Sequence, residues 1–265
     1  MKISFKYTFF IFCALMMFVT FKIPAQENLF SKEYFIQKED TLKYRMLLPK
    51  DFSESESYPL VLFLHGAGER GDDNIKQLTH GSDMFVKYRD SFPAIVIFPQ
   101  CPQTDYWANA MVNRGTKPLT LTFPKDVAAT KALNMVMLLV DEMLLKTHIN
   151  KEQVYVGGLS MGGMGTFEIL YRKPDVFAGA FAICGAGLPE TAEAYAKKVS
   201  MWIFHGANDD VVNPQFSVDM VGGILKYGGK PNFSLYAKDN HNSWDSAFDE
   251  PELLPWLFSN IKTKQ

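Results

Sequence analysis

The fold is decided by the stretch Val154-Tyr155-Val156-Gly157-Gly158-Leu159-Ser160-Met161-Gly162. Its first three residues predict a short strand, and the apolar pattern of residues 162–171 predicts a helix directly after the turn. Between them lies the pattern G-x-S-x-G, in which a sharp turn holds the serine in strained geometry and presents its hydroxyl above the sheet edge. Side chains flanking such a turn have no room, which accounts for the two glycines. The pattern makes Ser160 a candidate nucleophile, with an ordinary glycine-serine loop as the alternative.

Alternating strand and helix patterns extend outward from this turn in both directions. Apolar runs predict strands over residues 60–64, 94–98, 177–183, 201–204 and 233–236, after an opening hairpin over 35–37 and 43–47. Helical spacing covers residues 125–146, 162–171, 216–226 and 251–261. Strands that alternate with helices form βαβ units. We therefore expect an α/β fold with a mostly parallel central sheet and helices on both faces.

The composition fits one large globular domain. The 265 residues are 47% hydrophobic and 21% charged, which excludes a disordered chain. A formal net charge of −2 argues against a nucleic-acid-binding protein, whose footprint is a basic surface. Three cysteines exclude a disulfide-stapled miniprotein. We expect Cys101 and Cys184 to be unpaired, although the sequence leaves a disulfide between them open.

The first 25 residues predict an export signal. Lys2 and Lys6 form a positive start, the apolar run of residues 8–21 follows, and Ala25 offers a small residue before a cut. The run is 14 residues long, whereas a membrane span needs roughly 20. We therefore expect cleavage after Ala25 rather than an uncleaved anchor, and no stable membrane span afterwards. This predicts a periplasmic or secreted protein in which residues 26–265 form one domain.

A serine hydroxyl is a weak nucleophile and needs a base. In this architecture the acid follows the serine and the histidine comes last, each at the end of a strand. His205 stands before a glycine and is interpreted as a turn residue. His241 follows the last predicted strand, where the base belongs, with a surface-loop histidine as the alternative. The acid is expected in the turn after residues 201–204, where Asp209 and Asp210 compete.

A developing oxyanion needs backbone N–H donors. One belongs to Met161, the residue after the candidate nucleophile. The second is expected from the glycine-rich loop after residues 60–64, where we nominate the N–H of Ala67. The alternative is an ordinary turn without a catalytic role, because turns after buried strands also contain glycine. Glu69 and Arg70 of this loop are expected to brace it as a buried pair, or alternatively to reach into the cleft.

At this point the sequence resembles the α/β-hydrolase superfamily over essentially the whole chain after residue 25. It is more closely similar to exported esterases known as predicted peptidases, polyhydroxybutyrate-depolymerase-like or carbohydrate-esterase-like proteins. The resemblance rests on four stretches: Leu64-His65-Gly66-Ala67-Gly68-Glu69-Arg70-Gly71-Asp72-Asp73-Asn74, Phe98-Pro99-Gln100-Cys101-Pro102, Gly158-Leu159-Ser160-Met161-Gly162-Gly163 and His241-Asn242-Ser243-Trp244.

The resemblance implies the hydrolysis of carboxylic esters through an acyl-serine, without metal or cofactor. The family's acid is the fourth residue after the histidine of a His-Gly turn, which selects Asp209. Short-chain or carbohydrate-linked esters are the implied substrates, as small molecules or attached to a polysaccharide. A serine peptidase with the same residues and a non-catalytic binding module are the alternatives.

The loops suggest where a substrate would lie. Residues 99–124 form a 26-residue connection, and connections this long inside compact domains are usually functional. We expect Trp107 from this connection to stack on a substrate ring, or alternatively to pack over the core. Trp244 and Gly68 are also assigned to the pocket. Since 17 residues separate Ile183 from Met201, no large lid and an open cleft are expected.

Overall fold

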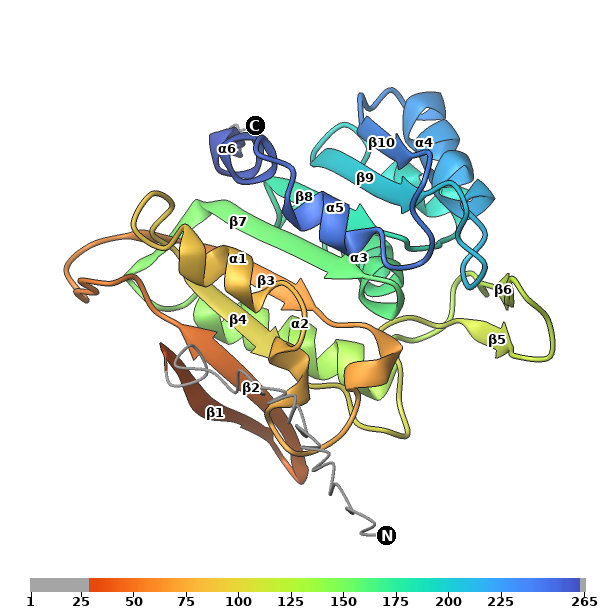
Figure 1. Ribbon diagram of the computed structural model, residues 1–265. Coiled ribbons are helices and arrows are strands. Elements are labelled where there is room, and N and C mark those ends of the chain that lie inside the picture. Colours follow the sequence, from red (N-terminus) through yellow and green to blue (C-terminus); the bar gives the residue numbers. More distant parts are fainter. Residues whose placement is uncertain (1–28, 263–265) are drawn as a thin grey trace, which may run out of the picture.

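The computed structural model describes residues 29–262, so the expected export signal over residues 1–25 lies outside the described residues. Eight strands form one sheet in the order β1-β2-β4-β3-β7-β8-β9-β10 (Figure 1). Their bounds are β1 (Phe30–Gln37), β2 (Asp40–Leu47), β3 (Tyr58–Leu64), β4 (Ile95–Pro99), β7 (Ile149–Leu159), β8 (Gly179–Ile183), β9 (Ser200–Gly206) and β10 (Asn232–Tyr236). The pairs β1–β2 and β2–β4 are antiparallel, and the other neighbouring strands run parallel. The mostly parallel sheet is therefore confirmed.

The central strands bury both of their faces. Residues Leu60 to Leu64 of β3 are all fully buried, which explains their unbroken apolar run. Leu62 packs in one core cluster with Val136, and Phe63 packs in the opposite cluster with Phe85. Those two partners belong to helices on opposite faces of the sheet (Figure 1). Helices thus cover both faces, as expected.

The helices are α1 (Ser82–Lys87), α2 (Lys131–Met143), α3 (Met161–Arg172), α4 (Gln215–Lys226), α5 (Trp244–Phe248) and α6 (Leu253–Ser259). Short 3₁₀ helices also occur in the described chain: η2 (Ala67–Glu69), η3 (Lys76–Leu78) and η4 (Pro189–Ala194). The helix expected over residues 125–146 begins later, because the Thr130 side chain caps it by accepting from the Leu133 N–H at 3.2 Å. None of the helices described between residues 29 and 262 combines the length and the hydropathy that a membrane span requires.

The long connection over residues 99–124 contains a small hairpin that the sequence patterns did not predict. Its strands are β5 (Met111–Asn113) and β6 (Thr120–Thr122), which form a separate antiparallel pair beside the main sheet (Figure 1). Strands of three residues are too short to show a clear periodicity. Between β8 and β9, η4 is the regular element of the described chain, which agrees with the absence of a large lid.

The turn between β7 and α3 is held by contacts between backbones. Ser160 adopts φ 53° and ψ −115°, a strained conformation for a residue with a side chain. A Cβ atom added to Gly162 would overlap the carbonyl oxygen of Leu64, and one added to Gly158 would overlap the carbonyl oxygen of Gly162. The Ser160 N–H donates to the Ile183 carbonyl at 2.8 Å. Glycine is therefore required on both sides of the serine.

This packing predicts different effects for alanine at two helical glycines. Gly162→Ala should lower the free energy of unfolding by about 3 kcal/mol or more, because backbone atoms of β3 would have to move. Gly222→Ala in α4 is the matched control, since no heavy atom lies within 4 Å of its added Cβ. That variant should gain up to about 1 kcal/mol from helix propensity. Urea unfolding measures both, and equal stability of the two variants would contradict the steric account.

Candidate active site

The structure brings together three residues that lie far apart in the sequence. The Ser160 hydroxyl oxygen lies 3.0 Å from His241 Nε2, and His241 Nδ1 lies 2.7 Å from Asp209 Oδ2. Ser160 follows β7, Asp209 follows β9 and His241 follows β10. The carboxyl ends of these parallel strands meet at one edge of the sheet, which is where such folds place their sites. The serine, acid and histidine predicted from chain order are thus in hydrogen-bonding contact.

The geometry also separates the two competing aspartates. Asp209 is 4% exposed, and its Oδ1 accepts from the backbone N–H groups of Val211 at 2.8 Å and Val212 at 2.9 Å. Asp210 is exposed, and its backbone N–H donates to the Asn240 side chain at 3.0 Å. Asp209 is therefore the carboxylate that faces the histidine.

His205 is a member of this cluster that the sequence reading missed. It is fully buried, and its Nε2 lies 3.1 Å from Asp209 Oδ2 and 3.0 Å from the Val212 carbonyl oxygen. Both of those groups are acceptors, so Nε2 carries a hydrogen, and Nδ1 is in hydrogen-bonding contact with the Ser217 hydroxyl at 2.7 Å. Asp209 Oδ2 thus receives hydrogen bonds from two imidazoles. The interpretation as a turn residue was wrong, and the available signal was a histidine ending an apolar strand four residues before the acid.

These contacts keep Asp209 ionised. Burial acts to raise the pKa of its carboxyl group, but hydrogen bonds from His205 and His241 and the charge of His241 lower it well below the ordinary range. A permanently charged carboxylate holds Nδ1 of His241 protonated and leaves Nε2 free to accept the serine proton.

The two nominated oxyanion donors belong to elements next to Ser160. Met161 is the first residue of α3, and the N–H groups at the start of a helix have no partner inside it. Ala67 is the first residue of η2 and lines the same pocket as Ser160. The two nominated donors therefore lie on the elements that border the serine.

Arg70 braces the loop that carries Ala67. Its Nε donates to the Ala67 carbonyl at 3.0 Å, and its Nη1 donates to the carbonyls of Gln103 and Asp105, each at 3.2 Å. The expected Glu69–Arg70 pair is not what braces the loop. Glu69 lines the pocket, with its Oε1 3.8 Å from His80 Nε2. Backbone carbonyls satisfy the guanidinium instead.

The pocket in front of Ser160, called the catalytic pocket below, has a cavity volume of about 230 Å³. It contains Ser160 and His241 together with Gly66, Ala67, Gly68, Glu69, His80, Tyr106, Arg114, Leu119, Leu159, Met164, Val211, Val212 and Trp244. The predicted places of Trp244 and Gly68 in the pocket are thus matched by the geometry. The Trp244 ring also lies 5.5 Å from the His241 ring and 5.1 Å from the His80 ring.

The substrate-stacking role expected for Trp107 was wrong. Trp107 is fully buried, and its indole N–H donates to the His65 carbonyl at 3.2 Å. His65 is buried as well, and burial lowers its pKa to about 4, so the ring stays neutral and accepts from the Cys101 N–H at 3.0 Å. Trp107 therefore supports the loop from beneath, and its neighbour Tyr106 is the aromatic residue that reaches the pocket.

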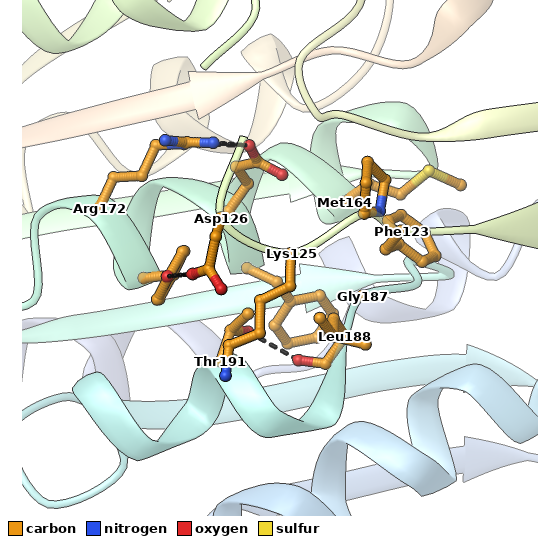
Figure 2. A pocket seen from close by; sticks show the side chains of 12 residues that line it. Phe123, Lys125, Asp126, Met164, Arg172, Gly187, Leu188 and Thr191 are labelled. Carbon is orange, nitrogen blue, oxygen red and sulfur yellow. Dashed lines mark hydrogen bonds and ion pairs between the residues drawn. The ribbon is translucent and has the colours of Figure 1, made fainter. Parts of the chain in front are cut away.

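Figure 2 shows a smaller pocket, and Met164 lines both this pocket and the one that contains Ser160. Its cavity volume of about 20 Å³ leaves room for little more than a water molecule. Two contacts join its polar groups: Arg172 lies 2.7 Å from Glu168, and the Tyr171 hydroxyl donates to Asp126 at 3.2 Å.

Cys184, Asp209 and His241 form the cluster whose ligand atoms could approach a metal ion, all lying within 4.8 Å of one another. Burial raises the pKa of the Cys184 thiol well above its ordinary value, so the thiol remains protonated. Asp209 and His241 already bond to each other. The donor set fits a hydrogen-bonded pair better than a metal site. Cys101 and Cys184 are both unpaired and buried, as expected.

Comparisons with known proteins agree with this geometry. The model of the phospholipase/carboxylesterase family matches residues 52–250. A bifunctional acetylxylan esterase/xylanase of Neocallimastix patriciarum is 31% identical over 63% of the chain and 21% of its own length. Lysophospholipase-like protein 1 of Mus musculus is 29% identical over 76% of the chain and 86% of its own length.

A solved structure shares the fold at higher coverage. A thermostable esterase superposes with a TM-score of 0.79 and 31% identity, over 89% of this chain and 64% of that one. The chain thus spans about a fifth of the xylan-acting relative and under two thirds of the solved esterase. From the family match and the shared fold, the chain belongs to the phospholipase/carboxylesterase family and has the α/β-hydrolase fold.

Proposed function

We propose that the protein hydrolyses carboxylic esters through an acyl-serine intermediate. The observation that supports this most strongly is the continuous hydrogen-bonded series from the Ser160 hydroxyl through both nitrogens of His241 to Asp209. A nucleophile, a base and a group that orients the base are the three parts that this chemistry needs.

In the proposed mechanism, Ser160 Oγ attacks the ester carbonyl while its proton passes to His241 Nε2. Asp209 stabilises the imidazolium through its bond to Nδ1. The N–H groups of Met161 and Ala67 bind the oxyanion of the tetrahedral intermediate. His241 then protonates the departing alcohol, which leaves the acyl group on Ser160. Water, deprotonated by His241, releases the carboxylic acid and restores the serine.

Short-chain or carbohydrate-linked esters are the proposed substrates, either free or attached to a polysaccharide. The similarity to an acetylxylan esterase supports a carbohydrate as the alcohol part of the ester. The pocket supports it as well, because aromatic rings of Tyr106 and Trp244 share it with the polar side chains of Glu69 and His80. We further propose that residues 1–25 direct the protein to the periplasm or outside the cell.

Replacement of the nucleophile gives the first test of this function. Ser160→Ala should lower kcat on a short-chain p-nitrophenyl ester by at least about 10⁴-fold, since the attacking oxygen is lost. Circular dichroism and urea unfolding would check that the variant still folds. Retained turnover in a folded variant would overturn the proposal. A panel of acetylated and feruloylated sugars and a dipeptide amide, assayed with the unaltered protein, separates an esterase from a peptidase.

The adjacent aspartates provide a matched pair. Asp209→Asn should lower kcat by about 10⁴-fold, because the amide reverses the preferred tautomer of His241. Asp210→Asn removes the same charge one residue away, at an exposed side chain without a bond to His241. It should retain nearly full kcat. Similar losses in the two variants would show that Asp209 has no special role.

A further inference from the structure

The β5–β6 hairpin forms one wall of the catalytic pocket. Leu121 of β6 is 6% exposed and packs in one cluster with Met164 and Val212. The Leu119 N–H donates to the Val211 carbonyl at 2.8 Å. Val211 stands two residues after Asp209 in the sequence. The hairpin is thus anchored on the loop that carries the acid, and its residues keep a defined position relative to the serine.

Arg114 lies in the turn of this hairpin and lines the pocket that contains Ser160. Within residues 29–262, its guanidinium has no hydrogen-bond or ion-pair partner. The other arginines bond to protein groups: Arg45 to Asn74, Arg70 to Ala67, Arg89 to Leu48 and Arg172 to Glu168. The unpaired guanidinium of the described chain is therefore the one that faces the catalytic pocket.

The charge of Arg114 is felt at Tyr106, which lines the same pocket. Burial raises the pKa of Tyr106, and the charges of Arg114 and Arg70 oppose that increase. The acidic group of the pocket, Glu69, is directed elsewhere: its Oε2 lies against Gly66 and its Oε1 lies near His80. The pocket thus holds a carboxylate on its oxyanion-loop wall and a free guanidinium on its hairpin wall.

We propose that Arg114 binds a carboxylate carried by the ester substrate, so that the enzyme prefers acidic esters over neutral ones. This inference rests on the proposed esterase function. A planar guanidinium matches a carboxylate through two parallel hydrogen bonds. The chain has a net charge of −2, and Glu69 adds a negative charge to the pocket, so an anionic substrate needs a local cation to bind. Arg114 supplies that cation at the one wall where no protein carboxylate pairs with it.

Two pairs of substrates test the proposal and locate the carboxylate. In the first pair, 4-acetoxybenzoate is compared with its methyl ester, so the charge lies on the departing alcohol. In the second, mono-4-nitrophenyl succinate is compared with its methyl ester, so the charge lies on the acyl group. The quantity measured is the ratio of kcat/KM for the acid to that for its neutral partner, which removes differences in intrinsic reactivity when variants are compared.

Arg114→Gln should lower this ratio by about tenfold in one of the two pairs, mainly through KM. The neutral ester is the reference within each pair, so a general effect of the substitution on the pocket cancels in the ratio. Lys117→Gln is the matched control: it removes the same charge from the same hairpin turn, but Lys117 does not line the pocket. Its ratio should stay close to that of the unaltered protein. Added salt should reduce the preference in the unaltered protein.

Each outcome decides the matter. A ratio unchanged by Arg114→Gln in both pairs, or lowered equally by Lys117→Gln, overturns the carboxylate site while leaving the esterase intact. If Arg114→Gln lowers the acid-to-neutral ratio in the first pair, the recognised carboxylate lies on the alcohol. If it lowers the ratio in the second pair, the carboxylate lies on the acyl group. If the unaltered protein hydrolyses neither the acid nor the neutral ester of either pair, the proposed function itself fails and this inference fails with it.

Discussion

The close approach of two backbones, at Gly162 and Leu64, is the constraint on which the rest of the site depends. No side-chain atom fits between the start of α3 and the end of β3. The next residues after Leu64 begin the loop with Ala67, and the residues before Gly162 are Met161 and Ser160. One steric contact therefore positions the nucleophile and both candidate oxyanion donors relative to each other. The strained backbone of Ser160 persists because this packing leaves it no alternative.

Asp209 has a comparable role on the other side of the pocket. Its two oxygens accept from the backbone of its own loop and from two histidines. His205, at the end of β9, contacts both the Asp209 carboxylate and Ser217 of α4. These contacts hold the acid in position independently of its bond to His241. Such buried groups are stabilising only when every partner is present. The same loop anchors the β5–β6 hairpin through Val211, which links the wall of the pocket to its chemistry.

Much of the architecture could be predicted from the sequence, because its strongest signals have steric causes. The glycines around Ser160 and the apolar run of Leu60 to Leu64 reflect backbone contact and burial on both faces. Chain order was sufficient to select His241, whereas choosing Asp209 over Asp210 required a resemblance to relatives. The two aspartates differ in their three-dimensional surroundings and not in their local pattern.

The remaining features depend on tertiary contacts that no local pattern records. A tryptophan in a long connection is equally compatible with a pocket and with a core, and Trp107 packs in the core because His65 offers its indole a carbonyl. Strands β5 and β6 are too short for periodicity, so the hairpin that carries Arg114 was not predicted. Arg70 was expected to pair with its neighbour Glu69, but carbonyls brought in from residues 103 and 105 bind it.

The central claim is that Ser160 becomes acylated, and the most direct measurement is mass spectrometry of the enzyme quenched in acid during turnover of a short-chain p-nitrophenyl ester. The account predicts a mass increase equal to one acyl group, located by peptide fragmentation on Ser160 and lost on longer incubation. An acyl group located stably on another residue, or turnover without any acylated enzyme in rapidly quenched samples, would contradict it.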